Sequence, residues 1–585
     1  MRYSYPIMIA KPSSPTELRG YLAAFRSLFI SVGAFSFVIN LLMLMPAIYM
    51  LQIYDRVLAS RNTTTLLMLT LIMLAMFALE AVLELVRSRS LVRASAALDL
   101  KLGPRVFDAS FERTLRGRGG SAGQALGDLT NMRQFLTGKG LFAFFDAPWT
   151  PVFLLVIFLL HPWLGVFGLL AALLLLVLAW VNERATAPAL GAANQEGQAA
   201  NHYASSHLRN AEVIEAMGML GALRQRWLQR QSRMLVLQAQ ASDRAATVGA
   251  VTKFSRMAFQ SGILGLGALL VIDNQLSPGG MIAASILLGR ALAPVDLAMG
   301  SWRGLVSARG AYARLGELLG AHPADPERTA LPRPQGLVLA ENLVVAPPGV
   351  RQPVLKGIKF GASPGMLVAV IGPSASGKST LARALVGVWP PLSGTVRLDG
   401  ADVHQWDKAE LGPWIGYLPQ DVELFEGTVA ENIARFGAPE DGKIVQAAQR
   451  AGVHEMILRL PQAYETPIGE GGTALSGGQR QRIGLARAMY GSPALIVLDE
   501  PNANLDEAGD AALVEALREM KRENCTVFVM THRLNVLSVV DAVMVLANGS
   551  IQAYGPREAV LKAMPQRPLA NPAETNKTLS NEAAA

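Results

Sequence analysis

The clearest chemical signal in this sequence is a glycine-rich loop between a strand pattern and a helix pattern. Residues 371–380 read IGPSASGKST, follow an apolar run and precede a helix-forming stretch. The spacing G-x-x-x-x-G-K-S is that of a phosphate-binding loop, in which backbone N–H groups and a helix N-terminus converge on an anion. Lys378 would reach the terminal phosphates, and the Ser379 hydroxyl would ligate Mg²⁺. We predict a nucleotide-binding loop formed by Gly372, Pro373, Ser374, Ala375, Ser376, Gly377, Lys378, Ser379 and Thr380.

Two adjacent carboxylates stand at the end of another predicted strand. Residues 495–498 are all apolar and are followed by Asp499 and Glu500. Asp499 suits Mg²⁺ coordination, and Glu500 is placed to polarise an attacking water as general base. Because two carboxylates beside a polyphosphate would repel it in the absence of a metal, the pair implies Mg²⁺.

The composition indicates a membrane protein of several domains. Of the 585 residues, 51% are hydrophobic and 17% are charged, whereas a soluble protein has about 25% charged residues. The net charge of +8 is explained by Lys and Arg in cytoplasmic loops, so we expect no nucleic-acid partner. The single cysteine, Cys525, excludes an intramolecular disulfide and lies in an apolar run typical of a buried strand.

Six apolar runs have the length of membrane-spanning helices, which need about 20 residues each. They are residues 28–51, 64–86, 141–160, 163–181, 254–272 and 281–299. Residues 1–20 lack the pattern of a secretory signal peptide. The segments 87–140 and 182–253 are basic and helix-forming, with a break expected at 118–121. The positive-inside rule places both segments and both termini in the cytoplasm.

The sixth run carries charges that are costly in hydrocarbon. Arg290, Pro294 and Asp296 all lie within it, and each charge costs at least a few kcal/mol there. Either this helix lines a water-filled path, or it is shifted so that Arg290 lies nearer the cytoplasmic interface. Arg290 and Asp296 would point about 120° apart on a straight helix, so we do not expect them to pair.

The proline pattern divides the chain. We expect a cytoplasmic lead at 1–20, a six-span transmembrane domain at 21–319 and a proline-rich linker at 320–335. A mixed α/β nucleotide-binding domain would follow at 336–562. The polar remainder, 563–585, is predicted to be disordered.

Four further motifs occur in a fixed order around the loop and the carboxylates. They are Gln420 within YLPQD, the sequence LSGGQ at 475–479, Asp506 within NLD and His532 within THR. The complete set resembles that of ABC ATPases. The resemblance implies an α/β P-loop ABC nucleotide-binding domain with ATP and Mg²⁺ as cofactors. Six spans fused to one such domain resemble a half-transporter with the type IV ABC exporter fold.

The resemblance assigns the LSGGQ motif to the partner's nucleotide. Ser476 and Gly478, with Gly477 and Gln479 beside them, would contact the γ-phosphate of ATP bound to the opposite subunit. The dipole of the helix that begins near Gln479 favours that contact. A site composed in this way needs two chains, so the simplest assembly is a homodimer.

The remaining roles are also implied by the resemblance. Gln420 would contact Mg²⁺ and sense the attacking water, and His532 would hydrogen-bond the γ-phosphate. Asp506 would lie across the dimer seam. Taken alone, these residues could equally be a turn residue, a strand-end side chain and a helix cap.

One feature departs from the family pattern. ABC exporters usually place an aromatic ring near the start of the ATPase domain, where it stacks on adenine. Here the matching stretch is 345–349 (VAPPG), and no aromatic residue occurs from Leu337 until Phe360. Because stacking contributes about 1–3 kcal/mol per base in other systems, we predict weak adenine selectivity.

Several stretches resemble the ATPase subunits of type I secretion systems of the protease-secreting kind. They are residues 50–58, 145–151, 470–472 and 499–506. The resemblance implies export of an unfolded polypeptide with an uncleaved C-terminal signal, often a glycine-rich calcium-binding repeat protein. It also implies a periplasmic membrane-fusion adaptor, an outer-membrane channel protein and a location among the lipids of the bacterial inner membrane. Helices near 125–136 and 212–220 would couple the ATPase to the spans.

Related toxin exporters carry an N-terminal peptidase-like domain. Only about 27 residues precede the first span here, so we expect no cleavage of a leader peptide. Two alternatives to protein export stay open at this point. One is an exporter of lipids or small hydrophobic molecules, and the other is an ATPase that regulates a channel or partner.

Overall fold

The computed structural model describes residues 16–117, 122–208, 210–324, 328–350, 352–472, 474–503, 505, 507–531 and 533–563. The chain forms two compact units. The first comprises residues 1–114 and 118–325, and the second comprises residues 115–117 and 326–585.

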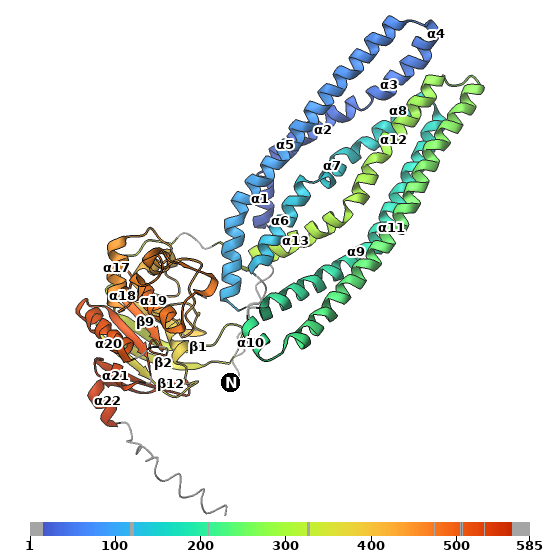
Figure 1. Ribbon diagram of the computed structural model, residues 1–585. Helices are drawn as coiled ribbons and strands as arrows, with labels where there is room; N and C mark the ends of the chain where they lie inside the picture. The colour runs from blue at the N-terminus through green and yellow to red at the C-terminus, as the bar shows by residue number, and fades with distance from the viewer. Residues whose placement is uncertain are drawn as a thin grey trace, which may run out of the picture. The chain divides into compact units, whose positions relative to one another are not determined.

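The first unit consists of helices (Figure 1). In chain order they are α1 (Thr16–Ala23), α2 (Arg26–Leu42), α3 (Met45–Gln52), a π-helical turn η1 (Ile53–Val57), α4 (Leu58–Ser60), α5 (Thr63–Leu115), α6 (Ala122–Thr137), α7 (Lys139–Asp146), η2 (Ala147–Trp149), α8 (Thr150–Leu160), α9 (Pro162–Leu208), α10 (Ala211–Ala216), α11 (Leu220–Ile272), α12 (Pro278–Gly300) and α13 (Trp302–Ala321).

The prediction of six membrane-spanning helices is confirmed. Among the described residues, six helical stretches are long and apolar enough to cross a bilayer, and each contains one predicted span. Helices α5 and α11 have 53 residues each, which corresponds to about 80 Å. The basic segments are therefore largely continuations of the spans, with α9 and α11 running side by side (Figure 1). The break expected at 118–121 lies outside the described residues.

The two charged residues of the sixth span interact with charged residues of other helices. Asp296 of α12 forms an ion pair with Arg256 of α11. Arg290 interacts electrostatically with Glu80 of α5. Asp296 therefore pairs with Arg256 and not with Arg290, as the angular separation of Arg290 and Asp296 predicted.

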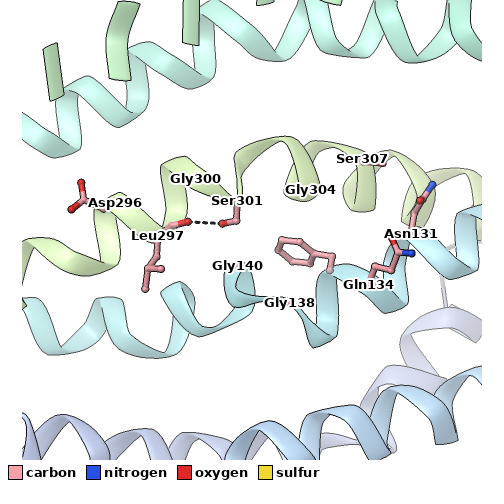
Figure 2. A pocket seen from close by; sticks show the side chains of 11 residues that line it. Asn131, Gln134, Gly138, Gly140, Asp296, Leu297, Gly300, Ser301, Gly304 and Ser307 are labelled. Carbon is pink, nitrogen blue, oxygen red and sulfur yellow. Dashed lines mark hydrogen bonds between the residues drawn. The ribbon is translucent and has the colours of Figure 1, made fainter. Parts of the chain in front are cut away.

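Two helix breaks lie next to each other beside this span. The α6–α7 break is at Gly138, and the α12–α13 break is at Ser301. A Cβ atom on Gly140 would lie 2.8 Å from the Ser301 Cβ, so a larger residue would push the two breaks apart. A cavity of about 430 Å³ lies between the two helix pairs, with Asn131 on one side and Asp296 on the other (Figure 2).

The second unit is of mixed α/β type, as predicted. Its strands are β1 (Val338–Val345), β2 (Leu355–Ala362), β3 (Leu367–Ile371), β4 (Ser393–Leu398), β5 (Ala401–Asp402), β6 (Ile415–Leu418), β7 (Gly427–Thr428), β8 (Pro467–Ile468), β9 (Leu495–Asp499), β10 (Thr526–Met530), β11 (Ala542–Ala547) and β12 (Ser550–Pro556). Its helices are α14 (Lys378–Leu385), α15 (Lys408–Leu411), η3 (Gly412–Trp414), α16 (Val429–Ile433), α17 (Asp441–Arg450), α18 (His454–Leu458), η4 (Ala463–Glu465), η5 (Glu470–Gly472), α19 (Gly477–Met489), α20 (Glu507–Arg522), α21 (Leu534–Leu537) and α22 (Arg557–Ala563).

The main sheet has the strand order β12-β11-β3-β10-β9-β6. Strands β11, β3, β10, β9 and β6 are parallel, and β12 is antiparallel to β11. Strands β9 and β10 are buried along their full length, which explains their continuous apolar runs. A second, antiparallel sheet has the order β2-β1-β4-β5.

Cys525 is buried immediately before β10, as its apolar surroundings predicted. Burial raises the pKa of its thiol to about 12. A thiol in this state carries almost no thiolate at neutral pH and is unreactive.

Candidate functional site

The glycine-rich loop, Asp499 and Gln420 lie at one edge of the main sheet because the strands that precede them belong to the same parallel sheet. The glycine-rich loop follows β3, Asp499 ends β9 and Gln420 comes shortly after β6. Strand β10 lies between β3 and β9, and β9 is paired with β6. The carboxyl ends of parallel strands lie at one edge of a sheet, which is where ligands bind in open α/β folds.

The glycine-rich loop has the backbone geometry of an anion cradle. Gly377 caps α14 with φ 105°, and Ala375 has φ 62°. A Cβ on Gly372 would lie 2.1 Å from the Leu546 carbonyl oxygen, so only glycine fits there. The side chain of Ser376 is buried, and its Oγ has no hydrogen-bond partner within the described residues.

Lys378 is folded against this loop. Its Nζ donates to the carbonyl oxygens of Gly372 at 2.8 Å and Pro373 at 3.2 Å. The side chain is 9% exposed, and the ammonium group has no carboxylate among these partners. It is therefore positioned to exchange two carbonyl contacts for phosphate oxygens.

Asp499 is a buried carboxylate whose ionised form a bound cation would stabilise. It is 1% exposed, and within the described residues neither of its oxygens accepts a hydrogen bond. Burial raises the pKa of Asp499; the nearby Ser379 hydroxyl opposes this shift, and the Glu500 carboxylate adds to it. Buried carboxylate oxygens beside a serine hydroxyl are ligands suited to Mg²⁺.

The side chains alone do not make a closed metal site. In the part of the chain that the structure describes, no cluster of three or more His, Cys, Asp or Glu side chains could hold a metal ion. Phosphate oxygens would have to complete the coordination, as they do in P-loop NTPases.

Glu500 is held at several points. Its backbone has φ 52°, a left-handed conformation that is strained for glutamate. Its N–H donates to the Met530 carbonyl at 3.0 Å. The Gln420 Nε2 lies 3.4 Å from the Glu500 Oε2. The two residues that would handle the attacking water are thus side by side.

The LSGGQ residues form the start of α19. Ser476 is the N-cap: its Oγ accepts from the Gln479 N–H at 3.3 Å, and its own N–H donates to the Gln479 Oε1 at 2.8 Å. This capping box leaves Ser476 exposed, with Gly477 and Gly478 half-buried beside it. Both of these hydrogen bonds join residues within the LSGGQ motif, and neither reaches the glycine-rich loop. Asp506 and His532 lie outside the described residues.

Three groups of contacts were not found by sequence reasoning. Gln481, within the LSGGQRQR stretch, donates to the Glu500 carbonyl oxygen at 3.1 Å. In the first unit, Asp55 accepts from the Ser277 Oγ at 2.6 Å and from the Gly279 N–H at 2.8 Å.

The third group is a buried polar network at Asp146. Asp146 accepts from Asn40 Nδ2 at 2.9 Å and from Arg87 NH1 at 3.3 Å. The Arg87 guanidinium also lies over the Phe142 ring, 4.2 Å from its centroid. Asp55 and Asp146 both belong to stretches that carried the secretion-system resemblance, but their partners lie too far along the chain to be inferred.

The fold and the site define a class of protein. Residues 29–293 match the family described as "ABC transporter transmembrane region", and residues 355–503 match "ABC transporter". A bacterial Atm1-family ABC exporter solved with ATP bound covers 96% of this chain and 99% of its own, with TM-score 0.77 and 20% identity. At that identity the likeness shows the fold alone, which is the exporter fold predicted.

Curated relatives narrow the class. The type I secretion system ATP-binding protein PrsD of Rhizobium meliloti (strain 1021) is 46% identical over 92% of both chains. The cyclolysin secretion/processing ATP-binding protein CyaB of Bordetella pertussis is 28% identical over 93% of this chain and 77% of its own. The toxin RTX-I translocation ATP-binding protein of Actinobacillus pleuropneumoniae is 27% identical over 92% and 77%. The chain therefore belongs to the ABC transporters, and within them to the type I secretion system ATP-binding proteins. It is a multi-pass membrane ATPase whose hydrolysis is coupled to transport.

Proposed function

We propose that this chain is the ATPase and permease of a type I secretion system, exporting an unfolded polypeptide with a C-terminal signal across the bacterial inner membrane. The observation that carries the proposal is that one chain combines six membrane spans with Asp499, Glu500 and Gln420 at the carboxyl edge of the main sheet. This chain is also 46% identical to a type I secretion system ATP-binding protein. The relatives named for toxin export support a polypeptide cargo. Export of lipids or small molecules is not favoured.

The site residues would act as follows. The loop from Gly372 to Thr380 holds the phosphates of ATP, with Lys378 on the terminal ones. Ser379, Asp499 and Gln420 would hold Mg²⁺, which neutralises charge on the phosphates when bound. Glu500 accepts a proton from the attacking water.

The second half of the site would come from a partner copy. Ser476, Gly477, Gly478 and Gln479 of one chain face ATP held by the other, and this requires a homodimer. The exposed capping box at Ser476 supports such a role, because its helix N-terminus is available to an anion. Asp506 at the seam and His532 at the γ-phosphate complete the assignment.

The assembly would include a periplasmic membrane-fusion adaptor, an outer-membrane channel and surrounding lipids. Both termini would be cytoplasmic. We retain the division into 1–20, 21–319, 320–335, 336–562 and 563–585 as a proposal. Within it, α6 and α10 correspond to the helices proposed to couple the ATPase to the spans.

The test is a comparison of secreted proteins with and without the chain. Deletion should remove one or a few polypeptides from the culture medium, and re-expression of the wild-type chain should restore them. Re-expression of Glu500→Gln should not, while Glu515→Gln, an exposed position on α20, should. An unchanged set of secreted proteins, together with ATPase stimulation by lipid, would overturn the proposal in favour of lipid export.

A further inference from the structure

The signature helix α19 is bonded to the catalytic carboxylate residue of its own chain. Gln481 is 3% exposed, and its Nε2 donates to the Glu500 carbonyl oxygen at 3.1 Å. The Ala503 N–H donates to the same oxygen at 3.2 Å and closes the turn that follows Glu500. The amide of Gln481 therefore helps to set the orientation of the Glu500 peptide group.

This bond acts on a strained backbone. Glu500 has φ 52°, a conformation that persists only where its surroundings hold it. A small shift of the peptide group would rotate the Glu500 side chain. It would also change the distance between the Glu500 Oε2 and the Gln420 Nε2, which is 3.4 Å. Catalytic geometry is sensitive to such shifts, because a displacement of about 1 Å can lower a rate by a factor of about 100.

The same helix begins at Ser476, which is exposed. Gln481 lies five positions after Ser476 in the chain, which corresponds to a rise of about 7.5 Å along the helix. A second contact lies one turn further on: a Cβ on Gly484 would be 2.6 Å from the Val422 side chain, in the segment just after Gln420. The helix thus contacts Glu500 directly and packs against the segment that follows Gln420.

We propose that Gln481 is a positioning residue that couples the two ATP sites of the dimer. The inference rests on the proposed composite site, in which Ser476 contacts ATP on the partner chain. When Ser476 engages that ATP, the shift of α19 passes through Gln481 to Glu500, which serves the ATP on its own chain. Occupancy of one site therefore sets the activity of the other.

The first test uses the full chain in nanodiscs of phosphatidylethanolamine and phosphatidylglycerol. Gln481→Leu has a similar size but no donor, and it should lower kcat by a factor of about 10 to 100 with little change in the KM for ATP. The control is Asn432→Leu, at another fully buried amide that donates to backbone carbonyls (those of Phe425 and Thr428). The control should lower the amount of folded protein but not kcat per folded molecule. If Gln481→Leu behaves like this control, the role is structural and the inference is wrong.

The second test measures the coupling itself in mixed dimers purified by two tags. One chain carries Lys378→Ala, which empties its site, and the other is wild type or Gln481→Leu. Emptying the partner's site should lower hydrolysis per intact site by a factor of about 10 in the wild type and less than about 2 in Gln481→Leu, since the two changes remove the same coupling. Equal losses in both backgrounds, or no loss in the wild type, would overturn the coupling.

A third dimer separates this inference from the proposed function. In it, Ser476→Arg on one chain is paired with a wild-type partner. If hydrolysis at the partner's loop is unaffected, the composite site itself is wrong. Suppose instead that this hydrolysis is lost, and that in the second test the Lys378→Ala partner lowers hydrolysis equally in the wild type and in Gln481→Leu. In that case only the coupling through Gln481 is wrong.

Discussion

The Nε2 of Gln420 lies 3.4 Å from the Oε2 of Glu500, although 80 residues separate them in the chain. The two residues follow β6 and β9, which are paired in parallel register. A donor at this distance makes a weak hydrogen bond, so the carboxylate keeps most of its capacity to accept a proton from water. This contact supports the proposal that Gln420 and Glu500 handle the attacking water.

Glu500→Gln should retain ATP binding and lose hydrolysis. The amide cannot accept the proton of the attacking water, and loss of a general base lowers kcat by about 100-fold or more. Binding can be measured with labelled ATP, and turnover by phosphate release. The control Glu515→Gln changes an exposed carboxylate paired with Arg518 and should leave both unchanged. Normal steady-state hydrolysis in Glu500→Gln would refute Glu500 as the base.

Asp499→Asn should stabilise the metal-free protein and abolish its response to Mg²⁺. Burial raises the pKa of Asp499, so its ionised form is less favourable in the folded than in the unfolded chain. Metal-free stability should therefore fall as pH rises through the interval between the ordinary aspartate pKa and the raised one. The variant removes this cost and should therefore raise the thermal midpoint of the metal-free protein. Thermal shift with and without Mg²⁺ and ATP measures both effects; a lower midpoint without metal would contradict the interpretation.

ATP and GTP should be hydrolysed at comparable rates. The loop between β1 and β2, residues 346–354, contains no aromatic residue to stack on the base. Phosphate contacts must then supply most of the binding energy. The measurement is kcat/KM for both nucleotides, and a strong preference for ATP would show that another group reads adenine. Introducing Pro347→Tyr should lower the KM for ATP, by about tenfold if stacking contributes near the lower end of 1–3 kcal/mol.

Gly279→Ala should destabilise the junction between η1 and α12. The new Cβ would lie 2.6 Å from the Asp55 Oδ1 and 2.7 Å from the Leu51 carbonyl oxygen. Overpacking of this kind costs about 1–3 kcal/mol. The matched control is Gly265→Ala on α11, where a Cβ meets nothing within 4 Å and alanine favours the helix. A lower thermal midpoint for the first variant only is expected, and equal midpoints would contradict the packing argument.

The Arg87–Asp146 pair should show strong coupling in a double-mutant cycle. Arg87 and Asp146 side chains are 4% and 13% exposed, and removing one partner of a buried pair costs about 3–5 kcal/mol. The double variant Arg87→Met with Asp146→Leu should be destabilised by less than the sum of the single variants, by about 1 kcal/mol or more. Arg89→Met, at an exposed neighbour, should cost less than about 0.5 kcal/mol. Additive effects in thermal unfolding would show that the pair is not energetically coupled.

Much of the fold could be predicted because its signals are local. A membrane span needs only a continuous apolar run, and all six were found, but their extension into helices of 53 residues was not. The segments beyond the spans are polar, and nothing in their composition says where a helix already formed must stop. Similarly, apolar runs in the sequence predicted the buried strands β9 and β10.

The sequence by itself determined the glycine-rich loop, because contiguous residues with fixed spacing make it: Gly377 caps the helix that begins at Lys378. It also determined the identity of the carboxylates at the end of β9. Only the tertiary structure decided which distant residues share one environment, such as Gln481 with Glu500, Arg87 with Asp146 and Asp55 with Ser277. The physical reason is that side-chain partners across helices and strands depend on packing and register, which no local pattern encodes.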